Sequence, residues 1–348
     1  MQIDDIRQRL QTHGAGATHI HAVVRAWTQA RSLDSGGQLP ANYFPARLLA
    51  VLPSIETALA AIARLRSAHA GGDDSRRLLI ELADGQTVES VLLPREAVCV
   101  STQVGCAVGC VFCMTGREGL ARQLGSAEIV AQVVLARHMR TVRKVQFMGM
   151  GEPAHNLDNV CAAIALLGTA GGFAHKNLVF STVGDLRVFD RLPREQVKPA
   201  LALSLHSTNA QLRARLLPRA PRINPADLVD LGENYARATG YPIQYQWTLL
   251  EDINDGDDEV AGIARLLAGK YAVMNFIPWN SVSGLDFRRP TRERALTMVR
   301  VLREHGVLAT VRDSAGQDVE GGCGQLRARA VAAPAHHFPS PQPAVGRG

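Results

Sequence analysis

Cys106-Ala-Val-Gly-Cys110-Val-Phe-Cys113 has three cysteines in a C-x3-C-x2-C spacing, between a run that predicts a strand and a run that predicts a helix. Three thiolates can hold a [4Fe–4S] cluster through three of its irons. The fourth iron is then open to a small molecule, which a site with four cysteines would not allow. Phe112 is placed to shield such a cluster from water, and Gly105 and Gly109 let the backbone wrap around a bulky group.

Two other interpretations of these cysteines stay open at this point. A zinc site could use the same residues with Cys99 as fourth ligand, although zinc modules usually have two C-x2-C pairs or histidine partners. A disulfide framework is disfavoured, because the start Met1-Gln-Ile-Asp-Asp has no basic segment followed by an apolar run. Six cysteines in a reducing compartment indicate metal or redox chemistry instead.

The composition is that of a soluble globular enzyme. Of 348 residues, 46% are hydrophobic and 20% are charged, which suits one large core with a small accessory domain. The longest apolar stretch without a charge, residues 160–174, is too short and too rich in glycine to span a bilayer. We therefore expect a cytoplasmic protein with no membrane partner.

The net charge is +6, and most of the excess is arginine. The planar guanidinium group suits phosphates and stacks on bases, so this charge favours an RNA partner. A merely basic surface would have the same composition, and the charge alone gives weak support.

The two ends of the chain differ from its middle. Residues 1–70 have apolar residues at helical spacing, including a helix expected over 55–68, and predict a helical accessory domain. Residues 331–348 are rich in proline and alanine without periodicity and predict a disordered tail.

Residues 71–97 predict a β-hairpin extension. Two strand-like runs, 78–82 and 87–93, flank Asp84-Gly85, which is a strong hairpin signal. Glu89 lies on the second run, where a glutamate is usually solvated.

From residue 98 onward, strand-like and helix-like runs alternate, which is typical of a parallel sheet covered by helices. Strands are expected at 98–103, 142–150, 178–183, 200–207, 243–250, 272–279 and 307–313. Helices are expected at 126–139, 156–167, 186–192, 225–239, 258–267 and 291–305. Six such units over residues 98–330 predict an α/β fold, a partial (βα)6 barrel that is open rather than closed by eight strands.

Polar residues follow several of these strands, at the edge where parallel sheets carry their sites. Met148-Gly-Met-Gly151-Glu152-Pro153 follows the second strand and offers a carboxylate to an ammonium group. Ser181 ends the third strand, Ser204-Leu205-His206 ends the fourth, and Asn280 follows the sixth. Each alone would be an ordinary structural residue, but together they predict one cavity.

Three further cysteines lie outside the C-x3-C-x2-C segment. Cys323 lies in Glu320-Gly-Gly-Cys-Gly-Gln, a loop that is poorly suited to core packing and well suited to reaching a site. Cys99 begins the first strand of the expected barrel. Cys161 lies on the apolar face of a helix and is expected to be a core residue.

Taken together, these motifs resemble those of the radical S-adenosylmethionine (SAM) adenosine methyltransferases, which methylate a ring carbon of adenine in 23S ribosomal RNA. The family includes C2-methyltransferases, some of which also act on transfer RNA, and a C8-methylating relative. The similarity spans most of residues 78–330 in family order. It rests on Val100-Ser-Thr-Gln-Val-Gly-Cys-Ala-Val-Gly-Cys-Val-Phe-Cys-Met-Thr-Gly, Phe147-Met-Gly-Met-Gly-Glu-Pro, Phe180-Ser-Thr-Val-Gly, Leu203-Ser-Leu-His-Ser, Ile277-Pro-Trp-Asn and Cys323-Gly-Gln-Leu.

The resemblance implies a role for each matching residue. One [4Fe–4S] cluster, whose open iron binds SAM, is expected on Cys106, Cys110 and Cys113. Contacts to SAM are expected from Gly151, Glu152, Ser181, Ser204, Leu205, His206 and Asn280. The expected catalytic residues are Cys323 as methyl carrier, Cys99 as the cysteine that resolves it, and Glu89 as proton acceptor.

The implied reaction uses SAM twice. Cys323 takes a methyl group by direct displacement, and a 5′-deoxyadenosyl radical from a second SAM removes a hydrogen from that methyl. The carbon radical adds to adenine, and Cys99 then attacks Cys323, leaving a transient disulfide. This route is needed because C2 and C8 of adenine are poor nucleophiles. A small redox protein is implied as electron donor, and we expect a monomer.

C2 of adenine is the favoured target, with three alternatives left open. Met114-Thr115-Gly116 departs from the C2 enzymes and has the Thr-Gly of the C8 enzyme, while residues 281–289 differ from both. The methylated carbon and the class of RNA therefore stay open. A radical SAM enzyme acting on a non-RNA substrate would not need Cys323. A zinc-stabilised RNA-binding protein would leave the strand-end residues without a role.

Overall fold

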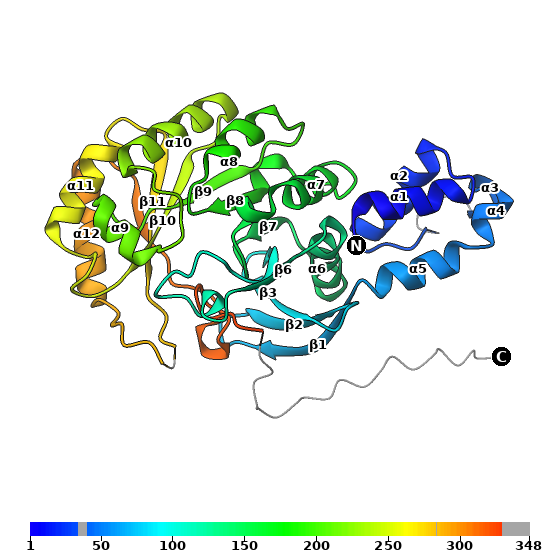
Figure 1. Cartoon of the computed structure of the whole chain (residues 1–348), viewed down its shortest axis with the longest axis horizontal. Coiled ribbons are helices and arrows are strands. Elements are labelled where there is room, and N and C mark those ends of the chain that lie inside the picture. The colour runs from blue at the N-terminus through cyan, green and yellow to red at the C-terminus, as the bar shows by residue number, and fades with distance from the viewer. Residues whose placement is uncertain (34–39, 283, 329–348) are drawn as a thin grey trace.

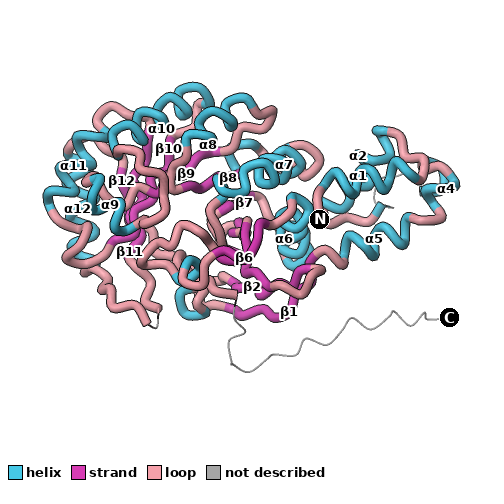
Figure 2. Tube along the Cα trace, in the orientation of Figure 1, coloured by secondary structure: helices cyan, strands magenta, loops and turns pink. Residues whose placement is uncertain are grey.

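The computed structural model describes residues 1–33, 40–282 and 284–328, and one ten-stranded sheet dominates it (Figure 1, Figure 2). Its strands follow the order β1-β2-β3-β4-β7-β8-β9-β10-β11-β12. Neighbours from β1 to β4 are antiparallel, and neighbours from β4 to β12 are parallel. The predicted hairpin and the predicted barrel therefore share one sheet.

The parallel part has the predicted alternation of six strand-helix units and a final strand. Its strands are β4 (Ala97–Cys99), β7 (Lys144–Phe147), β8 (Leu178–Thr182), β9 (Ala200–Ser204), β10 (Ile243–Leu249), β11 (Ala272–Pro278) and β12 (Ala309–Val311). The helices between them are α6 (Ser126–Met139), α7 (Leu157–Gly168), α8 (Leu186–Arg191), α9 (Ala210–Leu216), α10 (Pro225–Thr239), α11 (Asp257–Leu267) and α12 (Arg292–Glu304). The α/β class and the open partial barrel are confirmed.

The core lies between the parallel strands and the helices that cover them. Phe180 of β8 and Leu203 of β9 are fully buried, and Trp247 of β10 packs edge-to-face on Phe276 of β11 with ring centroids 6.2 Å apart. Strands buried on both faces need continuous apolar runs, which is why these segments are recognisable in the sequence. Polar side chains come where the strands end, so the apolar sheet positions the site at its edge.

A second sheet of two strands was not predicted. β5 (Gln103–Gly105) pairs antiparallel with β6 (Leu120–Gln123), with Val104 opposite Arg122. The strand expected at 98–103 therefore stops at the end of β4, and its last residue begins the ribbon instead. The ribbon brackets the segment that contains the three closely spaced cysteines.

The antiparallel part, which we call the antiparallel extension, contains β1 (Ala63–Ala70), β2 (Arg76–Leu82) and β3 (Thr87–Leu93). The predicted hairpin is confirmed as β2 and β3, whose register places Leu79 opposite Glu89. β3 also pairs antiparallel with β4, so the extension and the barrel are hydrogen-bonded to one another through these two strands.

The helix predicted over 55–68 is wrong in its second half. α5 (Leu52–Ala60) ends early, and the chain pairs with β2 from Ala63 to Ala70. The arginine- and alanine-rich run has good helix propensity, but pairing along the edge of β2 outweighs it. The helical accessory region therefore ends before β1.

The accessory helices lie at one end of the molecule, beside α6 (Figure 1). They are α1 (Ile3–Thr12), α2 (Ala17–Thr28), α3 (Pro40–Tyr43), α4 (Ala46–Leu49) and α5. Leu10, Val23 and Leu48 are buried and belong to the same hydrophobic cluster as the barrel residues. The accessory helices are therefore continuous with the main core.

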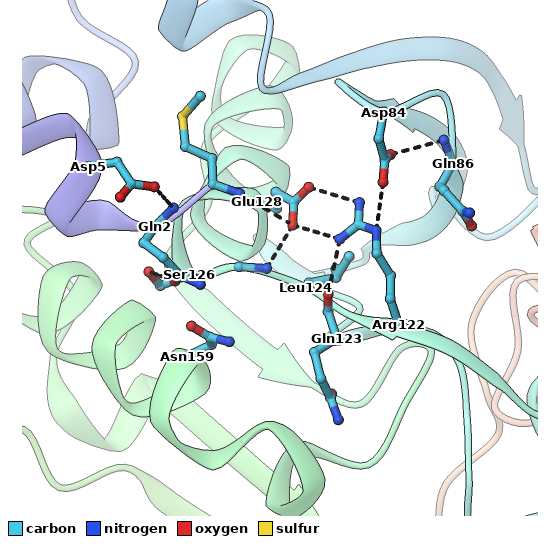
Figure 3. Close-up of polar contacts among 12 residues, drawn as sticks. Gln2, Asp5, Asp84, Gln86, Arg122, Gln123, Leu124, Ser126, Glu128 and Asn159 are labelled. Carbon is cyan, nitrogen blue, oxygen red and sulfur yellow. Dashed lines mark hydrogen bonds and ion pairs between the residues drawn. The ribbon is translucent and has the colours of Figure 1, made fainter. Parts of the chain in front are cut away.

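Polar contacts attach the N-terminus to the start of α6 (Figure 3). Ile3 N–H donates to Ser126 Oγ at 2.9 Å, and Ser126 N–H donates to Gln2 Oε1 at 3.0 Å. Each of these bonds joins a group at the beginning of α1 to a group at the beginning of α6, so two helix ends satisfy one another.

Arg122 on β6 links three parts of the fold (Figure 3). It donates two bonds of 2.9 Å to the Glu128 carboxylate, which also accepts from Gly125 N–H at 2.7 Å. It also pairs with Asp84 in the β2–β3 turn at 2.7 Å. The β5–β6 ribbon, α6 and the antiparallel extension are therefore held by one guanidinium group.

Three remaining predictions can be placed. Cys161 lies on α7 with 3% of its surface exposed, which confirms it as a core residue. The predicted disordered tail, 331–348, lies outside the described residues. Within the described ranges, no helix is both long enough and apolar enough to cross a membrane.

Candidate active site

The cluster loop, residues 106–113, runs from the end of β5 and contains Cys106, Cys110 and Cys113. Gly105 and Gly109 have φ values of +79° and +64°. A Cβ atom on Gly105 would lie 2.0 Å from Gly119 O, a distance that no side chain tolerates. Both positions therefore need glycine for its backbone conformation, and Gly105 also needs it because the chain passes very close to Gly119 there.

The three cysteines lie near one another, with Cys106 buried and Cys110 and Cys113 partly buried. Burial raises the pKa of Cys106 to about 12 and the pKa of Cys110 well above its usual value, and the other two thiols raise the pKa of Cys110 further. Burial also raises the pKa of Cys113. Such thiols ionise readily only beside a cation, so the donor set suits a metal cluster that binds thiolates.

The zinc interpretation finds no ligand set in the described part of this structure. Among the described residues, no three His, Cys, Asp or Glu side chains are grouped as ligands of a single metal ion.

Glu152 follows β7 and is buried, unlike the exposed glutamate that is usual at a strand-to-helix turn. Its Oε1 accepts from Ala154 N–H and its Oε2 accepts from Val183 N–H, both at 3.0 Å. Its own N–H donates to Gln103 Oε1 at 2.8 Å, and a Cβ atom on Gly151 would clash with Gln103 at 2.6 Å. Burial raises the pKa of Glu152 to about 7, although hydrogen bonds to the carboxylate from Thr182, Ala154 and Val183 oppose the rise.

His206 lies just after β9 with a φ of +60°, which is rare outside glycine. Its Nδ1 accepts from Thr248 N–H at 2.9 Å, so the proton of the neutral ring is on Nε2. Burial lowers the pKa of His206 to about 3, and the nearby Arg213 lowers it further. The ring packs edge-to-face on Phe112, with centroids 4.9 Å apart. A neutral imidazole, whose Nε2–H has no hydrogen-bond partner among the described residues, therefore lies beside the cluster loop.

Arg213 on α9 joins two strand ends, and no motif in the sequence marks it as a site residue. Its Nε donates to Leu205 O at 3.1 Å, and its Nη2 donates to Ser204 O at 3.2 Å and also to Val183 O. Burial lowers the pKa of Arg213 to about 10. In the sequence it resembles the surface arginines around it, and only the tertiary structure shows that it is buried.

The remaining strand-end residues lie where the sequence predicted them. Ser181 and Ser204 are half-buried at the ends of β8 and β9, and Leu205 is fully buried. The contact of Glu152 with Val183 joins the ends of β7 and β8, and the Arg213 bonds join the ends of β8 and β9. These side chains therefore belong to one edge of the sheet, as the polar pattern indicated.

Asn280 follows β11 and contacts the Cys323 loop, which we define as residues 313–328. Its Nδ2 donates to Cys323 O at 2.9 Å and to Ser314 Oγ at 3.0 Å. Its Oδ1 is buried and has no hydrogen-bond partner among the described residues, so it is an acceptor available to a ligand. The neighbouring Trp279 donates from Nε1 to Phe112 O at 3.1 Å, which joins β11 to the cluster loop.

The Cys323 loop lies against the residues that follow the third cysteine. Figure 1 shows this orange C-terminal segment beside the cyan segment near residue 115. Met114 N–H donates to Gly324 O at 2.8 Å, and Thr115 Oγ1 donates to Leu326 O at 2.7 Å. Two segments that are two hundred residues apart in sequence are therefore bonded together.

Cys323 itself is exposed, whereas Cys99 on β4 is buried. Burial raises the pKa of Cys99, and Cys323 is close enough to raise it further. Cys323 also raises the pKa of Cys113, for which burial is again the main cause. All six cysteines are free thiols, so the disulfide implied by the resemblance is not formed in this structure. The structure brings together the exposed thiol, the buried thiol and the cluster loop.

Glu89 is fully buried, so the expectation of a solvated side chain is wrong. Its Oε1 pairs with Arg77, and its Oε2 accepts from Arg327 N–H at 2.8 Å and from Ala328 N–H at 3.1 Å. The physical reason is that the end of the Cys323 loop covers this face of the hairpin. Nothing in the sequence distinguishes Arg77 from Arg76, the other arginine at the start of β2.

Comparisons with known proteins agree with this arrangement. The pattern of the radical SAM superfamily matches residues 100–265. The chain is 69% identical to a probable RNA methyltransferase of Aromatoleum aromaticum, over 95% of this chain and 94% of that protein. It is 68% identical to a probable RNA methyltransferase of an Azoarcus species, over 95% of each protein. A solved radical SAM methyltransferase from Sphaerobacter thermophilus is 33% identical, with a TM-score of 0.81 over 94% of this chain and 98% of that one.

Proposed function

Because the chain belongs to the radical SAM family that includes these methyltransferases, we propose that it methylates a ring carbon of adenine in RNA. We propose C2 as the target carbon and 23S ribosomal RNA as the substrate, with transfer RNA as a second substrate. C8 of the same base is the alternative. The net charge of +6 supports an RNA partner, and the radical SAM chemistry calls for a small redox protein as electron donor. We propose a cytoplasmic monomer.

The cluster loop and the strand ends would hold the cofactors. Cys106, Cys110 and Cys113 would ligate the [4Fe–4S] cluster, which supplies, when bound, the electron that starts radical chemistry on SAM. The buried Glu152 carboxylate would accept from the ammonium group of SAM, and the unpartnered Asn280 Oδ1 offers a further acceptor. The remaining contacts would come from Gly151, Ser181, Ser204, Leu205 and His206.

Cys323 and Cys99 would handle the methyl group. The Cys323 thiolate displaces the methyl from the SAM sulfonium, so that a sulfur–carbon bond forms as the sulfonium–carbon bond breaks. In the release step Cys99 attacks the Cys323 sulfur, and a disulfide forms as the bond from that sulfur to the transferred carbon breaks. The electron pair leaves with the carbon, which takes up a proton, and two electrons from a redox protein reduce the disulfide. The observation that carries this proposal is that the exposed Cys323 lies next to Gly324, which is bonded to Met114, and is near enough to Cys99 and Cys113 to raise the pKa of each.

The first test is mass spectrometry of the protein isolated from cells. Cys323 is expected to carry an added methyl group, which is lost in Cys323→Ala and kept in the matched control Cys161→Ala, whose cysteine is in the core. Wild-type protein that never carries this methyl would contradict the proposal. RNA methylation that survives Cys323→Ala would assign the chain to another radical reaction.

The second test identifies the base. Nucleosides from ribosomal and transfer RNA of a deletion strain are compared with those of the parent strain. Loss of 2-methyladenosine is expected, and loss of 8-methyladenosine would assign the C8 reaction instead. No change in either nucleoside would contradict adenine as the target.

A further inference from the structure

The antiparallel extension turns one face toward the Cys323 loop, and the strand register defines that face. Arg77 lies opposite Val91 in the β2–β3 pairing, and Val91 lies opposite Cys99 in the β3–β4 pairing. Directly opposite residues of antiparallel strands point to the same side, and so does Glu89, two positions before Val91. The buried Cys99 and the Arg77–Glu89 ion pair therefore share a face.

The residues that follow Cys323 in the loop are attached to this face. Glu89 Oε2 accepts the backbone N–H groups of Arg327 and Ala328, and Thr87 Oγ1 donates to Ala328 O at 3.2 Å. Arg77 makes this possible, because it compensates the charge of a carboxylate that has no access to water. Bonds from N–H groups to an ionised carboxylate are stronger than bonds to a neutral acceptor, so this attachment is firm.

The loop is also attached on the near side of Cys323. Gly321 lies over the same face, because a Cβ atom added to it would come within 3.5 Å of both Arg77 Cβ and Val91 Cγ1. Gly316 N–H donates to Asp73 Oδ2 at 3.0 Å, in the turn between β1 and β2. The extension therefore holds the loop before and after the reactive thiol, while the opposite side of the loop is bonded to residues 114–115.

We infer that Arg77 and Glu89 are positioning residues. They hold the Cys323 loop so that the Cys323 thiol stays close to Cys99 and to the cluster loop. Both oxygens of the Glu89 carboxylate are already engaged, one by Arg77 and the other by two backbone N–H groups. These contacts give Glu89 a role in holding the loop, which is separate from the proton acceptance that the resemblance implies. The inference rests on the proposed function only in that Cys323 is taken as the methyl carrier.

Hydrogen–deuterium exchange of the full chain tests the attachment without any turnover. In Arg77→Met and in Glu89→Gln, the amides of residues 320–328 are expected to exchange about tenfold faster or more, because their acceptor loses its charge or its partner. The matched control is Glu128→Gln, which removes another arginine-paired carboxylate that accepts a backbone N–H. Unchanged exchange over 320–328 in both test variants would overturn the inference.

A third variant avoids the risk that the two buried substitutions prevent folding. Asp73→Ala changes an exposed side chain at the other end of the attachment. It is expected to speed exchange at Gly316 severalfold while Arg327 and Ala328 stay protected. If Asp73→Ala instead speeds exchange over the whole Cys323 loop as much as Glu89→Gln does, the loop does not have separate attachments at its two ends.

Methyl loading separates positioning from proton transfer. The fraction of Cys323 that carries a methyl in protein from cells is expected to fall at least about fivefold in Arg77→Met and Glu89→Gln, because a loosened loop places the thiol poorly. A residue that only accepts a proton in the later RNA step would leave this fraction unchanged, and that result would overturn the inference for Glu89. If wild-type Cys323 carries no methyl, the proposed function fails, while the exchange experiment still decides whether Glu89 holds the loop.

Discussion

Two arginine–glutamate pairs in this protein have the same local construction and different surroundings. In each, the carboxylate accepts from a guanidinium group and from backbone N–H: Glu89 with Arg77, and Glu128 with Arg122. The side chains of Arg77 and Glu89 are 2% and 0% exposed, whereas Arg122 is 28% exposed. The first pair therefore lies in a dry environment and the second pair at the edge of water.

The two pairs differ in what can compensate the remaining charge when one partner is removed. Arg122 has a second acidic partner, Asp84, and its side chain is partly exposed. Arg77 has Glu89 as its only ion-pair partner in the part of the chain that the structure describes, and Glu89 lies where a lone charge is poorly tolerated. The buried pair fixes a loop that carries a reactive thiol, and the exposed pair fixes structural elements that only need to stay together.

The largest effect is expected for Arg77→Met, which leaves the Glu89 charge buried without compensation. Removing one partner of a buried ion pair typically destabilises a protein by about 3–5 kcal/mol. We expect a loss of this size in the free energy of unfolding, measured by urea denaturation of the variant and of wild type. A loss of less than about 1 kcal/mol would mean that water reaches Glu89 in solution.

A pH-dependent effect of nearly the same size is expected at Glu152, a buried carboxylate with no cationic ion-pair partner among the described residues. Its pKa rises from 4.5 to about 7 on folding because of burial, so the folded protein holds a proton that the unfolded chain releases. Stability is therefore lost as pH rises from 4.5 through 7, by on the order of 3 kcal/mol. Thermal unfolding of cluster-free wild type and of Glu152→Gln is compared from pH 5 to pH 8. The melting temperature of wild type should fall relative to that of the variant as pH rises through about 7.

The opposite trend would contradict this assignment. If wild type gained stability relative to Glu152→Gln as pH rises, the carboxylate would be better solvated or paired when folded than when unfolded. The carboxylate is near Asp185 and the thiols of Cys106 and Cys110, and charge on any of these would strengthen the predicted trend rather than reverse it.

The parts of the fold that repeat a simple rule could be predicted from the sequence. Strands buried on both faces need apolar runs, and helices that cover them need apolar faces, so the alternation from β4 to β12 is visible in the residues themselves. The cysteine spacing and the polar strand ends follow the same logic, because each is a local pattern. The structure places Glu152, His206 and Asn280 at the sheet edge, as predicted.

What could not be predicted depends on contacts distant in sequence. β1 was read as helix because its composition favours helix, and only the presence of the β2 edge decides otherwise. The sequence predicts a solvated Glu89, because nothing near it in sequence shows that residues 327–328 return to cover it. The burial of Arg213 cannot be predicted for the same reason, since its carbonyl partners lie at the ends of β8 and β9.

A smaller effect is expected when both charges of the buried pair are removed together. Arg77→Met/Glu89→Met replaces two charged side chains by apolar ones, which is often nearly neutral for stability. The Arg327 and Ala328 amides lose their acceptor, at a cost of about 1–2 kcal/mol. We expect urea denaturation to place the double variant above Arg77→Met in stability, while exchange over 320–328 stays fast in both. A double variant as unstable as the single one would show that packing, not uncompensated charge, explains the loss.

The smallest effect is expected for Glu128→Gln. Arg122 keeps Asp84 as a partner and a glutamine can still accept one hydrogen bond, so the loss in the free energy of unfolding should be about 1 kcal/mol. Because Arg122 is partly exposed, added salt screens this pair, and the difference between variant and wild type should shrink as sodium chloride rises from about 0.1 to about 1 M. The deficit of Arg77→Met should stay constant over the same range, since salt ions do not enter a dry site. If both variants depend equally on salt, the Arg77–Glu89 pair is not drier than the Arg122–Glu128 pair. Burial would then no longer explain why the Arg77–Glu89 pair holds the Cys323 loop in place.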